Sequence, residues 1–251
     1  PLGLYTRAYA LMMLPAQRFA APMTSVAVPA LARLVDDPPA YRRFYHRGIG
    51  LIAACTTPVA FMMAVAAPEL IPLVLGEQWL EAVPIFIALT PAAVMAATNV
   101  AGGWVYLSYG HVHRNLQWGL IEMGPFLLAI VIGLYWGALG VAIGVSLSRV
   151  LMKLPGLAWA YKGTPLRLTD FLSANVFPFF VGVMTCLAGL AAHAVCKEMQ
   201  VDDRLSRLSV KLVAMAATLA MGFLMCCQGR ENISQLRRML LRKNTPHETT
   251  T

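Results

Sequence analysis

Among the charged side chains inside long apolar stretches of this sequence are Arg7, Arg18, Glu122 and Arg149. An arginine at the centre of a membrane helix costs roughly 2.5–3.5 kcal/mol on insertion scales, so an idle helix facing lipid would not keep one. Arginine also suits a phosphate group, because its planar guanidinium can donate two parallel hydrogen bonds. These four residues are therefore the first candidates for lining a ligand path through a membrane.

Arg7 and Arg18 lie eleven residues apart in one stretch that Pro15, Pro22 and Pro29 interrupt. At about 100° per residue, eleven residues return to within about 20° of the start, so a helix places both arginines on one face. One interpretation is that both snorkel to the interfaces or pair with backbone carbonyls, which suits Arg7 better than Arg18. The other is a kinked helix that turns a cationic stripe toward a water-filled cavity.

Glu122 is the one acidic residue within the predicted membrane spans, and Arg149 lies near the middle of the next span along the chain. Arg149 could form a buried ion pair with Glu122 or line a cavity as a cation, and the sequence leaves both alternatives open. Lys153 lies four residues after Arg149 and shares its helix face. We expect Lys153 to snorkel to the cytoplasmic surface.

The composition is that of a membrane protein. Of the 251 residues, 58% are hydrophobic and only 13% are charged, whereas about a quarter of the residues of a soluble domain are charged. The net charge of +8 indicates basic cytoplasmic loops. No basic patch is interleaved with aromatic residues, so we predict no nucleic-acid partner.

No motif indicates catalysis. The histidines and cysteines are scattered without metal-ligand spacing, and no nucleophile is paired with a base in the sequence. We therefore predict that the protein is not an enzyme, with no catalytic residue, no metal site and no cofactor.

Apolar stretches predict an all-α fold, a polytopic transmembrane helical bundle of about seven spans. They lie at about residues 4–34, 48–67, 82–108, 116–135, 138–161, 171–195 and 208–227. Residues 1–227 would form this transmembrane domain and residues 228–251 a basic cytoplasmic tail. A short apolar piece, residues 69–75, is expected to lie at the membrane interface. Prolines within at least four spans suit a transporter that rocks, because broken helices are tolerated where they line a cavity.

Loop charges orient the bundle. Four basic residues fall on one side of the membrane, at Lys197, Arg204, Arg207 and Lys211, and twelve fall on the other. The positive-inside rule places the side with twelve in the cytoplasm, together with the C-terminus, and places Pro1 outside. An outside N-terminus without a signal segment suggests a piece of a longer protein that lacks at least one preceding span.

Five segments together carry a family resemblance. They are LGLYTRAYALMMLP (2–15), VAVPALARLVDDPPAYRRFY (26–45), LGEQWLEAVPIF (75–86), WVYLSYGHVHRNLQWGL (104–120) and WGALGVAIGVSLSRVLMKLP (136–155). In this order they resemble the C-terminal half of Wzx-type polysaccharide flippases, of the multidrug/oligosaccharidyl-lipid/polysaccharide exporter superfamily. The resemblance covers about residues 2–161.

This resemblance implies helices eight to fourteen of a fourteen-helix transporter in the bacterial inner membrane. Such a protein flips undecaprenyl-pyrophosphate-linked oligosaccharide by alternating access during exopolysaccharide or lipopolysaccharide synthesis. Cavity arginines would meet the anionic pyrophosphate, and Arg7 and Arg18 occupy the matching helix. The implied partners are the lipid-linked oligosaccharide, membrane lipids, a polysaccharide polymerase and chain-length or export proteins. The alternatives are a drug/cation antiporter of the same superfamily and a membrane-bound polysaccharide-assembly enzyme such as a polymerase.

The predicted orientation can be tested by labelling single cysteines introduced at loop positions. We expect cysteines at Asp36, His113, Gly163 and Asn244 to be labelled from the cytoplasm, and those at Glu77 and Asp202 from the periplasm. A periplasmic signal at His113 would contradict the seven-span topology.

Overall fold

Each apolar stretch predicted from the sequence forms helix. The structure, a computed structural model, describes residues 2–199 and 203–225. Its elements are α1 (Leu2–Ala32), α2 (Pro38–Leu75), η1 (Glu77–Ala82), α3 (Val83–Ala88), α4 (Thr90–Ala97), α5 (Val100–Ser108), α6 (Val112–Gly133), η2 (Leu134–Trp136), α7 (Gly137–Tyr161), α8 (Leu168–Glu198) and α9 (Arg204–Met225). The described residues contain no β-strand, which confirms the all-α class.

Several of these helices are suited to a membrane by length and composition. Four apolar helical stretches are long enough to cross one, and a bent pair of helices makes a fifth. One of the four, Val112–Tyr161, folds back on itself near Gly137 into α6 and α7. The 31-residue α1 is not among these stretches. The polytopic bundle is thus confirmed, the count of seven spans stays a prediction, and residues 228–251 lie outside the described residues.

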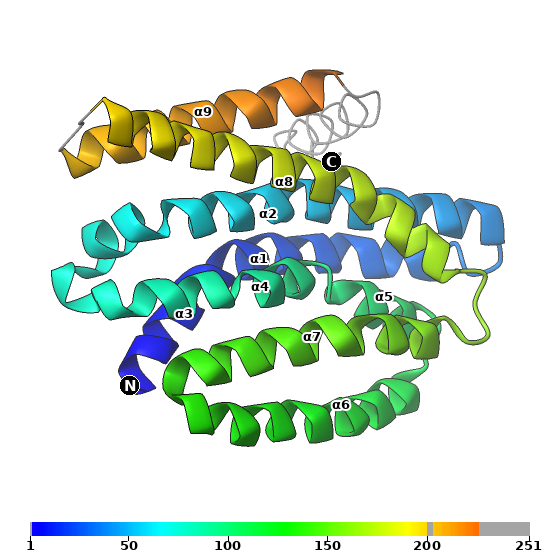
Figure 1. Ribbon diagram of the computed structural model, residues 1–251. Coiled ribbons are helices and arrows are strands. Elements are labelled where there is room, and N and C mark those ends of the chain that lie inside the picture. Colours follow the sequence, from blue (N-terminus) through cyan, green and yellow to red (C-terminus); the bar gives the residue numbers. More distant parts are fainter. Residues whose placement is uncertain (1, 200–202, 226–251) are drawn as a thin grey trace, which may run out of the picture.

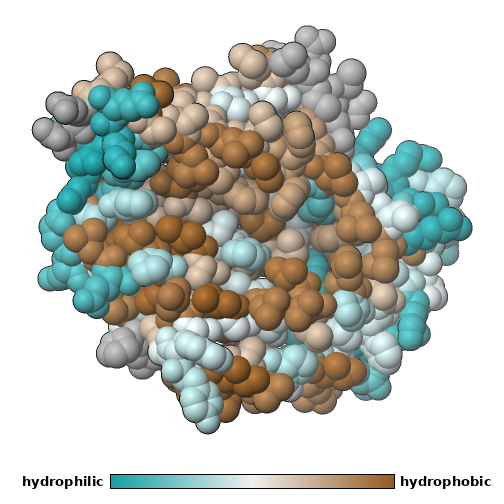
Figure 2. All heavy atoms as spheres, viewed as in Figure 1, coloured by the Kyte–Doolittle hydropathy of each residue, from teal (hydrophilic) through white to brown (hydrophobic). Residues whose placement is uncertain are grey.

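The long helices lie side by side with their axes in roughly one direction (Figure 1). α2 packs against α8, α8 against α9, and α6 against α7, while α1 contacts α2, α4 and α5. Hydrophobic side chains cover the middle of the face shown in Figure 2, and hydrophilic ones gather toward the two ends of the helices. This distribution matches a bilayer, whose apolar core is bounded by two polar interfaces.

The stretch 82–108 is one broken span rather than one helix. α3 and α4 meet at Leu89, and α4 and α5 meet at Thr98 and Asn99. The chain bends by 57° between the segments Glu77–Ala88 and Thr90–Ser108. Pro91 contributes to the break because it has no backbone N–H to donate. Residues 69–75, by contrast, continue α2 without interruption and are not a separate piece, while their place at the membrane interface stays a prediction. Packing within a bundle lets a helix absorb such prolines.

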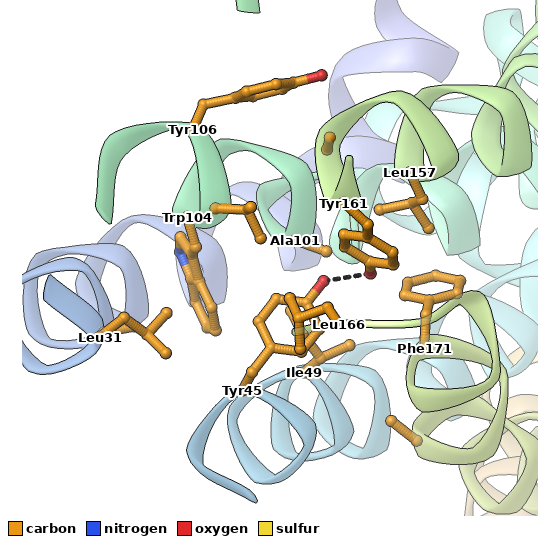
Figure 3. Close-up of a cluster of buried hydrophobic side chains, with 14 of the residues drawn as sticks. Leu31, Tyr45, Ile49, Ala101, Trp104, Tyr106, Leu157, Tyr161, Leu166 and Phe171 are labelled. Atoms are coloured by element: carbon orange, nitrogen blue, oxygen red, sulfur yellow. Dashed lines mark hydrogen bonds between the residues drawn. The ribbon is translucent and has the colours of Figure 1, made fainter. Parts of the chain in front are cut away.

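A core cluster joins α1, α2, α5 and α7, and Phe171 of α8 packs into it (Figure 3). Trp104 is fully buried, and its Nε1 donates a hydrogen bond to Thr24 Oγ1 at 3.0 Å. The hydroxyls of Tyr45 and Tyr161 meet at 2.6 Å beside it. Gly48 makes room for the indole, because a Cβ there would lie 2.9 Å from Trp104 Cζ3. The hydrogen bonds orient large aromatic side chains whose burial holds the four helices together.

α9 is attached to α2 by a buried ion pair that the sequence did not reveal. Lys211 Nζ donates to Glu69 Oε1 at 2.7 Å, and the side chains are 1% and 5% exposed. Lys211 was assigned to a loop from its charge, which is wrong because it lies inside α9. Breaking such a pair costs roughly 3–5 kcal/mol, because one charge is left buried and uncompensated.

Asp203 precedes α9 and caps its first turn. One of its carboxylate oxygens accepts hydrogen bonds from the Ser206 hydroxyl at 2.9 Å and the Ser206 backbone N–H at 3.1 Å. These bonds hold the pKa of the Asp203 carboxyl below its usual range. The cap fixes the start of α9.

Glycines let α6 and α7 approach closely, with Gly133/Gly137 and Gly140/Gly144 at GxxxG spacing. A Cβ at Gly133 would lie 2.7 Å from Gly140 O, and one at Gly144 would lie 2.6 Å from Ala129 O. Gly137 takes φ 69° at the turn between the helices, in the left-handed region that favours glycine. The hairpin therefore depends on backbone contact that a side chain would block.

We expect Gly144→Ala to destabilise the complete protein by about 1–3 kcal/mol, because the added methyl overpacks the hairpin. Gly119→Ala is the matched control in α6, since a Cβ there meets nothing within 4 Å. That control should be neutral or slightly stabilising, because alanine favours helix over glycine by about 0.8–1.0 kcal/mol. Thermal unfolding midpoints in detergent measure both, and equal midpoints would contradict the close-packed hairpin.

Candidate functional site

The candidate site is a cavity of about 330 Å³ between α1, the broken span and the α6–α7 hairpin. Three charged side chains line it, Glu122, Arg149 and Lys153. Its other polar lining residues are Tyr9, Asn99, Tyr106, Asn115 and Trp118. With two basic groups and one acid, the lining carries a formal charge of +1. Charge in an apolar bundle is expensive, so its concentration at one cavity identifies the candidate site.

Arg149 and Glu122 form the ion pair that was one of the two alternatives. Arg149 Nη1 donates to Glu122 Oε1 at 2.7 Å, with 35% and 22% of the side chains exposed. The guanidinium also lies over the Phe126 ring, 4.9 Å from its centroid. Because both residues also line the cavity, the pair does not remove Arg149 from it. The part that either residue takes in a substrate path stays a prediction.

Lys153 does not snorkel to the surface, so that expectation is wrong. Its side chain is buried, and Nζ makes one long hydrogen bond, 3.4 Å to the Met95 carbonyl. The ammonium also lies 5.4 Å from the centroid of the Phe171 ring. Met95 is near the end of the short helix α4, where carbonyls lack intrahelical partners, and this attracts the lysine inward.

A second α7 side chain, Ser146, donates a hydrogen bond at the break between α3 and α4. Ser146 Oγ donates to the carbonyl of Ala88, the last residue of α3, at 2.6 Å. Ser146 and Lys153 thus satisfy carbonyls at the ends of α3 and α4. This explains why polar residues occur along an otherwise apolar helix, since freed carbonyls must find partners inside the bundle.

Tyr106 adds an unused polar group to the cavity. It projects from the opposite side of α5 to Trp104 (Figure 3), and its buried hydroxyl has no hydrogen-bond partner among the described residues. Gly156 on α7 leaves room for the Trp118 indole, because a Cβ there would lie 2.8 Å from Trp118 Nε1. A buried hydroxyl without a partner costs free energy, so the cavity has capacity for a polar ligand or water.

Arg7 and Arg18 lie elsewhere. Both are exposed on α1 and neither lines the cavity, to which α1 contributes Tyr9 and Met13 instead. Among the described residues neither arginine makes an ion pair or a hydrogen bond. The structure therefore brings together Glu122 and Arg149 but not the α1 arginines, which occupy a second surface of the same bundle.

Sequence reasoning missed Tyr9 and Tyr106 as cavity residues. It predicted that Lys153 reaches the cytoplasmic surface, whereas Lys153 is buried and lines the cavity. The prolines of the broken span were the available signal, because a break frees carbonyls that attract donors from neighbouring helices. In the part of the chain that the structure describes, no three His, Cys, Asp or Glu side chains come together in a group that could hold a metal ion.

The described residues form a polytopic helical bundle with a charged interior cavity. A family model described as polysaccharide biosynthesis protein matches residues 1–84. The chain is 23% identical over 202 residues to the lipopolysaccharide biosynthesis protein WzxC of Escherichia coli (strain K12), covering 78% of this chain and 40% of WzxC. It is 24% identical over 246 residues to the teichuronic acid biosynthesis protein TuaB of Bacillus subtilis (strain 168), covering 96% of this chain and 49% of TuaB.

The structure also matches the lipid II flippase MurJ in an inward closed conformation. The TM-score is 0.61 at 14% sequence identity, over 88% of this chain and 47% of that chain. This match shows the fold alone, and the chain spans less than half the length of all three proteins. Together the comparisons confirm the resemblance to Wzx-type polysaccharide flippases.

The Glu122–Arg149 pair can be tested by neutralising each partner. Glu122→Gln or Arg149→Gln alone should lower the yield of folded protein, because each leaves one charge uncompensated inside the bundle. The double variant should restore much of that yield. Glu77→Gln is the control, since the Glu77–Arg204 pair is exposed and such pairs contribute about 0–1 kcal/mol. Equal losses in the single and double variants would argue against the pair.

Proposed function

We propose that the complete protein flips undecaprenyl-pyrophosphate-linked oligosaccharide across the bacterial inner membrane by alternating access, with this chain as its C-terminal lobe. The polymer would be an exopolysaccharide or a lipopolysaccharide component. The observation that carries the proposal is the exposed side of α1, on which Arg7 and Arg18 are unpaired among the described residues. The resemblance to Wzx-type flippases supports it.

With α1 placed in the membrane, as the resemblance implies, its exposed side with two unpaired arginines is incompatible with contact to lipid tails alone. Arg18 lies near the middle of α1, eleven residues from Arg7, and Ala21 and Ser25 are exposed on the same side. A central arginine costs roughly 2.5–3.5 kcal/mol against lipid, and that cost disappears if the helix faces water or an anion. The exposed side of α1 would therefore form one wall of a water-filled path.

The two arginines are spaced for an anion that moves along the helix. At 1.5 Å per residue they are separated by about 16 Å along the axis, roughly half the apolar core of a bilayer. A pyrophosphate could pass from one guanidinium to the other, with charge-assisted hydrogen bonds at each. Fixed cations at two depths would lower the barrier for an anionic head group that must leave water.

The charges of the cavity support flipping over cation exchange. A drug/cation antiporter needs an acidic group free to exchange a cation, and Glu122 is already held by Arg149. Lys153 adds a second positive charge to the same lining. A cavity with this balance favours anions over cations.

The remaining parts of the proposal follow from the same reading. The protein would act as a transporter and not as an enzyme, with its C-terminus in the cytoplasm. Its partners would be the lipid-linked oligosaccharide and membrane lipids. A polysaccharide polymerase and chain-length or export proteins would use its product.

Arg18→Ala in the complete protein should abolish polymer export while expression and membrane insertion stay near normal. Arg18→Lys should recover only part of the export, because lysine lacks the bidentate fork. The matched control is Arg33→Ala, which removes an exposed arginine just beyond the end of α1. Export is scored as surface polymer per unit of membrane-inserted protein.

Normal export by Arg18→Ala would overturn the cationic path. Loss of export in Arg33→Ala as severe as in Arg18→Ala would also count against it, because the effect would then reflect basic charge in general rather than charge at the membrane centre.

A further inference from the structure

A second, basic pocket lies where the first turns of α2 meet the start of α8, at the right-hand end of the helices in Figure 1. Its volume is about 340 Å³, and it is lined by Pro39, Arg42, Arg43, His46, Arg47 and Asp170. None of these residues lines the cavity of Glu122 and Arg149. We infer that this pocket binds the phosphate of an anionic membrane phospholipid, and this inference does not rest on the proposed function.

One wall of the pocket is fixed by α8. Arg42 donates twice to Asp170, from Nε to Oδ2 at 3.1 Å and from Nη2 to Oδ1 at 2.6 Å. The Arg167 backbone N–H donates to the same carboxylate at 2.8 Å. His46 Nε2 lies 3.1 Å from Ser173 Oγ. These contacts hold Arg42 and His46 in place before any ligand arrives, which lowers the entropy cost of binding.

The other wall of the pocket, on α2, carries positive charge that no acidic side chain among the described residues neutralises. Arg43 and Arg47 are exposed, and among the described residues neither has an acidic partner or a hydrogen bond. They lie four residues apart on one helix face, where like charges destabilise a helix by a few tenths of a kcal/mol. An anion between them would turn this repulsion into attraction. Arginine suits phosphate in particular, through two parallel N–H donors.

The position of the pocket along α2 selects a lipid as the source of the phosphate. Arg47 is followed directly by the apolar stretch that begins at Gly48, so the pocket lies level with the polar end of that stretch. Hydrophilic side chains gather at this end of the bundle in Figure 2. Phospholipid phosphates occupy this level in a bilayer, and basic pockets between membrane helices on the cytoplasmic side bind anionic head groups.

The test measures the lipid retained by the complete protein in nanodiscs of phosphatidylcholine with a minority of phosphatidylglycerol. After detergent extraction, mass spectrometry counts the phosphatidylglycerol bound per protein. We expect the wild type to retain phosphatidylglycerol. Arg43→Gln/Arg47→Gln should lose about tenfold or more of the affinity for this lipid, because each basic residue near the membrane surface contributes about one kcal/mol to anionic-lipid binding. This double variant leaves the Arg42–Asp170 pair intact, so the helix contact is preserved.

Two further variants make the result specific. Arg43→Lys/Arg47→Lys keeps the charge and loses the fork, and it should retain an intermediate amount of phosphatidylglycerol. Arg33→Gln/Lys162→Gln removes two exposed basic groups outside the pocket and should bind as the wild type does. Equal retention by the wild type and Arg43→Gln/Arg47→Gln overturns the inference, as does an equal loss in the Arg33→Gln/Lys162→Gln control.

Two competitors separate the lipid from other phosphates. Inorganic phosphate at millimolar concentration should leave the bound phosphatidylglycerol in place, and displacement would reassign the pocket to a soluble anion. Farnesyl pyrophosphate at an amount equal to the lipid should also leave it in place. Displacement by farnesyl pyrophosphate would reassign the pocket to isoprenoid pyrophosphates and overturn the phospholipid assignment. Because all readouts measure binding, they are independent of whether the protein flips a glycan lipid.

Discussion

The need to give every polar group inside an apolar bundle a partner organises this structure. The Lys211–Glu69 pair attaches α9 to α2, and the Arg149–Glu122 pair joins the two helices of the hairpin. Lys153 and Ser146 reach backbone carbonyls at the ends of α4 and α3. In a medium that offers no water, each of these groups would otherwise lose several kcal/mol of solvation. The partners of these groups therefore determine which helices must be neighbours.

The broken span is the source of the interior polarity. Because α3 and α4 end within the bundle, carbonyls near their ends attract donors from α7, and the cavity lies beside the bend. The hairpin supplies those donors from a helix that its glycines hold rigidly against α6. A proline-broken helix and a glycine-packed hairpin thus act together: one frees polar groups, and the other positions the groups that meet them.

Properties of a single helix could be predicted from the sequence, whereas properties that depend on neighbours could not. The hydrophobic runs located the helices, and the eleven-residue spacing placed Arg7 and Arg18 on a common exposed side. The Glu122–Arg149 pair was foreseeable as one of two alternatives, because the two residues lie in consecutive predicted spans. Lys153 was misplaced because its partner is a carbonyl freed by another helix. The Glu69–Lys211 pair was missed because nothing in the sequence makes α2 and α9 adjacent.

Arg7, Arg18, Arg43 and Arg47, which have no partner among the described residues, divide by location, and this division distinguishes two kinds of surface. Arg43 and Arg47 lie beside the polar end of the apolar stretch of α2, where lipid phosphates are always present, so a resident counterion suffices for them. Arg7 and Arg18 lie within α1, where bulk lipid offers no anion to Arg18 near its middle. A permanent ligand there would close the proposed path, and an empty site facing lipid would destabilise the helix. A surface that is hydrated and visited intermittently by an anion satisfies both constraints, which is the condition that a translocation path must meet.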